Sequence, residues 1–384
     1  MAKNLSIVAQ GISGDEGKLL GYNVTDNGIY TPAIGDVARD TTATYVAQDG
    51  TIKTAAENVA RVDYTNGVAE LLLEPESTNL IQNSEPTSAE GASGGVTYES
   101  FNWANGFTNC VRFENGSDGF WYGGVCVTNT INSISFYVKM DDSSLPNVGS
   151  SNSSGDFSVI LSGSFASNVK IVQETNDIYR ISGNFAVTTS ATSANGIVKY
   201  SGQSSKGFRV VGFQLEQQPY ATSYIPTNGA IATRGADSLT NFGSEQIIDS
   251  ESGILFFEGS VPTDEDSVWV ALTNDSNSTT TLSIGFEIGG AIRTYSRNNL
   301  GVIYTDAFTP LQTINSTYKF YLKYNETNVE FGVIGYYSNQ SNSFPIYGSN
   351  SFTQLTLSRT SSLPFYGRIR QVKHLPYNTD ITTL

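Results

Sequence analysis

The sequence predicts an all-β protein made of tandem β-sandwich modules. Its 384 residues include 21 Tyr and 20 Phe, whereas charged residues make up only 15% of the chain. Aromatic residues favour strands, and the abundant Gly, Ser, Thr and Asn favour the polar turns between them. Because no stretch keeps a helical period for more than two turns and one core rarely organises so long a chain, we expect two or three modules.

The first segment, residues 1–36, mixes single apolar residues with several glycines and shows no long alternation. Such a segment buries little by itself and needs a partner surface to become ordered. We therefore interpret residues 1–36 as an extended N-terminal arm for attachment or oligomerisation, with an unstructured terminus as the alternative.

Two hairpins follow the arm and open the first module, which we expect over residues 37–236. Asp49-Gly50 and Asn66-Gly67 each stand between short β-prone pieces. These dipeptides suit tight turns with positive φ. The second hairpin leads into the apolar run Leu71–Leu73, which is typical of a buried strand.

Alternating apolar residues predict the main strands of the first module. The even positions are apolar in Ile134–Val138 and the odd positions in Tyr179–Val187, so each strand should have one buried and one solvated face. Phe208–Glu216 is predicted to be the closing strand.

The second module is expected over residues 237–384. A strand pattern begins at Gly253–Val261, and Tyr318–Tyr324 should pair with Val329–Tyr336 through a turn at Asn325–Asn328. Phe365–Lys373 is predicted to be a terminal strand.

Charge and cysteine content exclude several classes of partner. A formal net charge of −15 repels phosphate backbones and anionic headgroups, so we expect no nucleic acid. No apolar stretch is long enough to cross a bilayer, so no membrane insertion is expected, and the first residues lack the apolar core of a secretory signal.

Cys110 and Cys126 could form a disulfide, but buried thiols are the favoured interpretation.

Two blocks of sequence carry a more specific signal. The first runs over Arg39–Tyr64 and Leu72–Ser84, and the second over Gly212–Glu216, Tyr220–Thr227 and Thr233–Asp237. Their order and spacing resemble the blocks that bracket a module in phage and prophage tail-fibre and head-spike proteins. The resemblance implies a jelly-roll module of the carbohydrate-binding type, and residues 253–384 resemble a laminin-G or concanavalin-like sandwich more loosely.

The resemblance also implies a function. The chain is expected to be a structural protein of a bacteriophage virion, as a fibre, spike or head decoration, made in the host cytoplasm. Its implied partners are capsid, portal or tail proteins through the N-terminal arm, other copies in a homotrimer, and host-surface polysaccharide. The alternatives are a decoration or cement protein that binds no glycan and a capsule depolymerase.

Glycan-binding residues can be proposed from composition alone. Sugar rings stack on aromatic side chains, with amides and carboxylates at the rim. Two clusters have this composition; their candidate residues are Asn102, Trp103, Asp118, Trp121 and Tyr122. The alternative is that the tryptophans fill the sandwich core. Tyr336, Tyr337 and Phe344 are secondary candidates in the second module.

No catalytic set is evident, so we expect no enzyme. The single histidine, His374, is interpreted as a surface residue, and the paired carboxylates Asp141/Asp142 and Asp264/Asp266 lie in polar loops rather than across a cleft. Calcium is conceivable at Asp264–Asp266 or Asp275–Asn277, but neither spacing matches a defined calcium loop, so no metal or cofactor is predicted.

Overall fold

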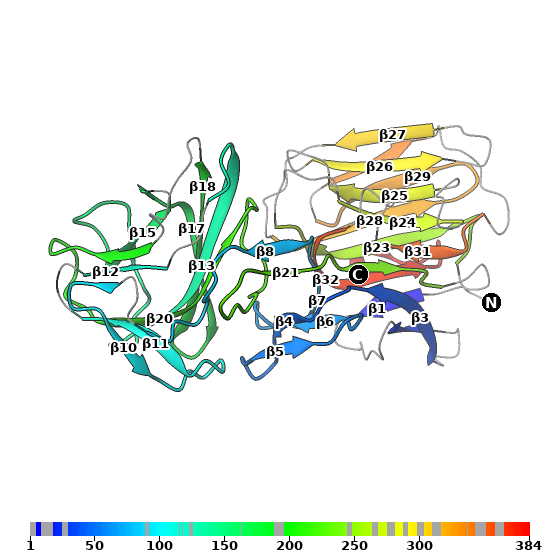
Figure 1. Cartoon of the computed structure of the whole chain (residues 1–384). Coiled ribbons are helices and arrows are strands. Elements are labelled where there is room, and N and C mark those ends of the chain that lie inside the picture. The colour runs from blue at the N-terminus through cyan, green and yellow to red at the C-terminus, as the bar shows by residue number, and fades with distance from the viewer. Residues whose placement is uncertain are drawn as a thin grey trace.

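The computed structural model shows two β-sandwich modules side by side (Figure 1). It describes residues 5–8, 18–24, 30–88, 92–114, 116, 118–122, 126–161, 163–187, 196–243, 248–262, 268–274, 281–286, 291–297, 303–308, 316–335, 337–341, 351–357 and 365–384. Both chain ends lie in the same module, which we call the frame module, and the middle of the chain forms the inserted module. The predicted all-β sandwich fold is confirmed.

The frame module consists of an eleven-stranded and a five-stranded sheet that enclose one apolar core. The larger sheet contains β1 (Leu5–Val8), β2 (Lys18–Val24), β3 (Tyr30–Ala38), β6 (Arg61–Asp63), β7 (Glu70–Leu73), β22 (Ser238–Thr240), β23 (Gly253–Ser260), β28 (Tyr318–Tyr324), β29 (Val329–Val333), β30 (Tyr337–Ser341) and β32 (Gly367–Leu375). The smaller sheet contains β24 (Val268–Thr273), β25 (Thr281–Phe286), β26 (Ile292–Arg297), β27 (Ile303–Phe308) and β31 (Gln354–Thr356).

Strand β32 joins the two ends of the chain. One of its edges pairs with β23, and the other is shared by β7, opposite residues 367–369, and β1, opposite residues 371–374. Leu5 and Ile7 are buried in the frame core. The prediction of an extended arm over 1–36 is therefore wrong for the described residues of that segment. Strand β32 of the same chain is the partner surface that orders β1, whereas we had expected that surface to belong to another protein.

The inserted module is a sandwich of two six-stranded sheets around a second apolar core. One sheet contains β10 (Thr97–Ser100), β11 (Asn109–Phe113), β13 (Thr130–Met140), β17 (Ser167–Thr175), β18 (Ile178–Val187) and β20 (Phe208–Glu216). The other contains β9 (Ala92–Ser93), β12 (Asp118–Trp121), β14 (Val148–Gly149), β15 (Phe157–Leu161), β16 (Ser164–Phe165) and β19 (Gly196–Lys199).

The chain crosses between the modules twice, and the two crossings pair with each other. They form the ladder of β8 (Ser77–Asn79) and β21 (Ala232–Arg234) (Figure 1). Since β3, β6 and β7 belong to the frame sheet, the division 1–36, 37–236 and 237–384 differs from the observed path. The first sandwich lies between the crossings, and the frame is built from both ends of the chain.

Both hairpins occur as predicted. Strand β4 (Ala43–Val46) pairs with β5 (Ile52–Ala55), and β6 pairs with β7. Gly50 and Gly67 adopt φ values of 78° and 75°, which a residue with a Cβ disfavours. The hairpin of β28 and β29 is also confirmed. A 3-10 turn, η2 (Ile381–Thr383), ends the chain.

The expected solvated face of β13 is absent. Ile134, Phe136 and Val138 enter the main core, but Ser135 and Tyr137 on the opposite face are each only 1% exposed. A second apolar cluster on that face contains Trp103, Phe107, Tyr137 and Tyr224, with Ile52 of the β4–β5 hairpin against it. Alternation identified the strand but not the neighbour that covers its other side.

In the part of the chain described, no helix is long and apolar enough to cross a membrane.

Candidate functional site

The sequence-predicted aromatic residues do not form a common site. Trp103 lies in the cluster outside β13, whereas Tyr122 lies in the main core of the inserted module. Both side chains are less than 10% exposed, which agrees with the alternative that they fill the core. Asn102 is exposed beside Trp103, and a sugar could not stack on either buried ring.

Trp121 retains an open surface. Its side chain is 37% exposed at the end of β12, and a Cβ on Gly196 would come within 2.6 Å of its ring. The indole therefore packs closely against a glycine of the neighbouring strand. Asp118 starts the same strand but is buried, and its Oδ1 accepts a hydrogen bond from the Gly95 amide at 2.6 Å. Asp118 thus anchors a turn.

His374 is not a surface residue, which corrects the prediction. It is fully buried on β32, and its Nε2 lies 2.9 Å from the Tyr324 hydroxyl. The frame core surrounds this position because β32 is the central strand of the larger sheet.

The carboxylates considered for catalysis are paired with cations. Asp141 accepts hydrogen bonds from Arg112 and Arg209 at 2.6 Å and 2.7 Å, and Asp142 lies 3.0 Å from Lys206. Asp264–Asp266, Tyr336 and Phe344 lie outside the described residues, as does Asp275–Asn277, and the side chain of Tyr337 is likewise not described. Cys110 and Cys126 are buried and not bonded to each other, in two separate apolar clusters.

The two blocks singled out in the sequence, within residues 39–84 and 212–237, meet in a buried ionic cluster. Arg39 Nη1 lies 2.9 Å from Asp237 Oδ1, and Arg61 also forms an ion pair with Asp237. Arg61 Nη1 lies 2.8 Å from Glu74, and Arg234 approaches both acids at 3.6–3.8 Å. All five side chains are buried.

Hydrogen bonds within the protein satisfy most of this cluster, although Arg61 Nε and Arg234 Nε have no hydrogen-bond partner. Ser223 donates its backbone N–H and its hydroxyl to the Glu74 carboxylate at 2.7 Å and 2.6 Å. Burial alone would raise the pKa of Glu74, but Arg234 and Arg61 outweigh it and hold that pKa well below its usual range. The charges of this network pair with one another within the protein and join separate segments of the chain, so we assign it a structural role.

A cleft between the two modules is the better candidate for a binding site. Its volume is about 630 Å³, which falls in the range typical of ligand sites, and such sites often occur where domains meet. The inserted module contributes residues of β17, β18 and the segment Pro219–Ala221. The frame module contributes the β6–β7 hairpin, Ser260, Pro262 and the start of β32.

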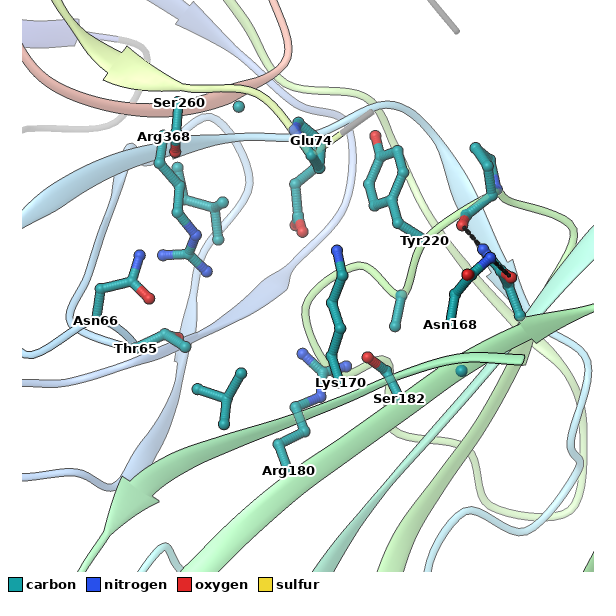
Figure 2. Close-up of a pocket in the computed structure, with 18 of the residues that line it drawn as sticks. Thr65, Asn66, Glu74, Asn168, Lys170, Arg180, Ser182, Tyr220, Ser260 and Arg368 are labelled. Carbon is teal, nitrogen blue, oxygen red and sulfur yellow. Dashed lines mark hydrogen bonds between the residues drawn. The ribbon is translucent and has the colours of Figure 1, made fainter. Parts of the chain in front are cut away.

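Polar side chains dominate the labelled walls of this cleft. Asn66, Ser260 and Arg368 stand on the frame side, and Lys170 and Ser182 face them from the inserted module (Figure 2). Tyr220 adds an aromatic ring. Amides, hydroxyls and one ring suit a polyhydroxylated ligand, because such a ligand needs many hydrogen bonds and one apolar face.

Sequence analysis missed this cleft, since its lining comes from segments more than 300 positions apart. Tyr220 stands within the second resembling block, but nothing local distinguishes it from the buried Tyr224 of the same block. Lys170 belongs to a strand with no marked motif. The contact between modules creates the site.

Comparison with solved structures finds two kinds of similar β-sandwich. The first is a carbohydrate-binding module, CBM40 of the Ruminococcus gnavus IT-sialidase bound to α2,3-sialyllactose, which is 13% identical and has a TM-score of 0.28. That match covers 33% of this chain and 75% of the module. The second is domains LG4-5 of the mouse laminin alpha1 chain, 9% identical over 78% of this chain and 95% of that one, with a TM-score of 0.26.

Sequence comparisons give no family assignment. No protein-family model matches the chain. No curated protein matches it either.

Proposed function

We propose that this chain is a non-enzymatic adhesion protein of a bacteriophage particle, a fibre, spike or head decoration, that binds surface glycan in the cleft between its modules. The glycan part rests on the cleft itself, a space of about 630 Å³ lined by amides, hydroxyls and Tyr220. The phage part rests on the resemblance of the two sequence blocks.

Binding at one such site is expected to be weak, because a saccharide is strongly hydrated in water and gains little from apolar burial. Several copies on one particle, as in the homotrimer that the resemblance implies, would raise avidity through effective concentration. Attachment to other virion proteins belongs to the same proposal.

A glycan array, followed by binding of host-surface polysaccharide, tests the proposal with two matched aromatic variants. Tyr220→Ala should weaken binding about tenfold, since the sugar loses the aromatic ring on which it stacks and water can enter the space that the ring had filled. Trp121→Ala should leave binding unchanged, because this exposed ring lies on β12 and does not line the cleft.

The opposite pattern would place the sugar at Trp121 and refute the cleft. Failure to bind any glycan would favour the cement-protein alternative, in which the chain contacts only virion proteins. Steady release of new reducing ends from polysaccharide would refute the non-enzymatic part.

A further inference from the structure

The inserted module presents two cations to the cleft from neighbouring strands. Lys170 lies on β17 and Arg180 on β18, and the register pairs Lys170 with Ser182 and Val172 with Arg180. Ile171 and Ile181 point the other way and pack against the core. Alternation along both strands therefore directs Lys170 and Arg180 to the same face, and Figure 2 shows both at the cleft.

Neither cation forms a direct ion pair with a carboxylate among the described residues, although Glu174, Glu216 and Glu74 raise the pKa of Arg180 from a greater distance. Lys170 is exposed and forms no ion pair with any residue that the structure describes. Arg180 donates to the Ser135 hydroxyl at 3.0 Å and to the Thr222 carbonyl at 2.5 Å, and its Nε has no hydrogen-bond partner. Although the residue as a whole is exposed, partial desolvation of its amine lowers the pKa of Lys170.

The other charges around the cleft are already neutralised. Arg368 forms ion pairs with Asp63 and Glu70, and Glu74 belongs to the buried ionic cluster. Glu174 stands near Arg180, but burial raises its pKa to about 7, so it carries only part of a charge at neutral pH. Lys170 thus lacks a counter-charge, and Arg180 is compensated only by acids that form no direct ion pair with it, in a chain whose net charge is −15.

We infer that the cleft binds an anionic saccharide, with its acidic group between Lys170 and Arg180. A carboxylate or a phosphate on the sugar would supply the missing counter-charge and accept charge-assisted hydrogen bonds from both side chains. Asn66 and Ser182 are placed to bind neighbouring hydroxyls, and Tyr220 to face the ring. This inference rests on the proposed function and specifies its ligand class.

The test is a glycan array in which each acidic member is also printed in a neutral form. Carboxylated sugars are paired with their methyl esters and phosphorylated sugars with their dephosphorylated forms, so the charge is the main difference within a pair. We expect the full-length protein to bind acidic members and to lose about tenfold or more in affinity for the neutral partner. The two series identify the acidic group.

Charge variants show whether Lys170 is responsible. Lys170→Gln should reduce affinity for acidic members about tenfold and leave neutral members unaffected, whereas Lys170→Arg should retain binding. Lys53→Gln is the matched control, because this lysine is also exposed and lies on β5, outside the cleft. Circular dichroism of each variant checks the fold.

Equal binding of acidic and neutral partners would overturn the anionic inference and leave the glycan proposal standing. Loss of charge selectivity in Lys53→Gln but not in Lys170→Gln would also overturn it. Absence of binding to every member would refute both proposals.

Discussion

At the scale of single residues, Glu174 is an acid whose surroundings disfavour its charged form. Neither carboxylate oxygen has a hydrogen-bond partner, and both are buried. Burial raises the pKa of Glu174 to about 7, partly opposed by Arg180. The folded protein therefore holds a proton there that an unfolded chain releases near pH 4.5.

Stability should accordingly fall as pH rises from about 4.5 to about 7, because the unfolded state ionises first. The contribution of this carboxyl to the free energy of unfolding is fully present below the pKa that it has in the unfolded chain. It is lost as the pH rises through the pKa that it has in the folded protein. A shift of this size corresponds to roughly 3 kcal/mol. Glu174→Gln removes the titration, so urea unfolding at pH 5 and pH 8 should differ less in the variant than in the parent protein. An unchanged pH dependence in the variant would contradict the assignment.

At the scale of elements, Asp237 fastens several segments to one another. Its carboxylate binds Arg39 after β3 and Arg61 of β6, and it also accepts the backbone N–H of Glu74 at 2.9 Å. These residues surround the two crossings between modules. The cluster therefore fixes the ladder of β8 and β21 relative to the frame sheet.

Asp237→Ala should lower the free energy of unfolding by about 3–5 kcal/mol, because it removes the counter-ion of the buried Arg39 and leaves Arg61 and Arg234 with Glu74 alone. Denaturant unfolding measures the loss. Lys53→Ala is the matched control: its ion pair with Asp49 is exposed, with side chains 50% and 57% accessible, and the unfolding midpoint should stay the same. Equal effects of the two variants would show that the buried ionic cluster contributes no more to the free energy of unfolding than an exposed ion pair does.

At the scale of the whole molecule, the N-terminal strands complete the frame. Strand β1 covers half of one edge of β32, and Leu5, Ile7 and Val37 are buried in the frame core. Fully burying an aliphatic side chain contributes about 1.5–3 kcal/mol, and total domain stability is only about 5–15 kcal/mol.

A chain that lacks residues 1–38 should therefore lose most of its stability and aggregate, since the edge of β32 becomes available for pairing with other chains. Thermal unfolding and size-exclusion chromatography test this against the full-length protein. A monodisperse product with the same melting temperature would support the separate-arm interpretation instead.

The sequence by itself determined both tight turns and several strands, among them β13, β18, β20 and β28. The dipeptides Asp49-Gly50 and Asn66-Gly67 and the alternation around Ile134 are local signals, and local geometry suffices to interpret them. Only the tertiary structure decided what covers each strand. It places residues 5–8 beside β32, buries His374 and Trp103, and brings Lys170 opposite Arg368 across a cleft. These outcomes depend on contacts between residues hundreds of positions apart, for which hydrophobic periodicity carries no information.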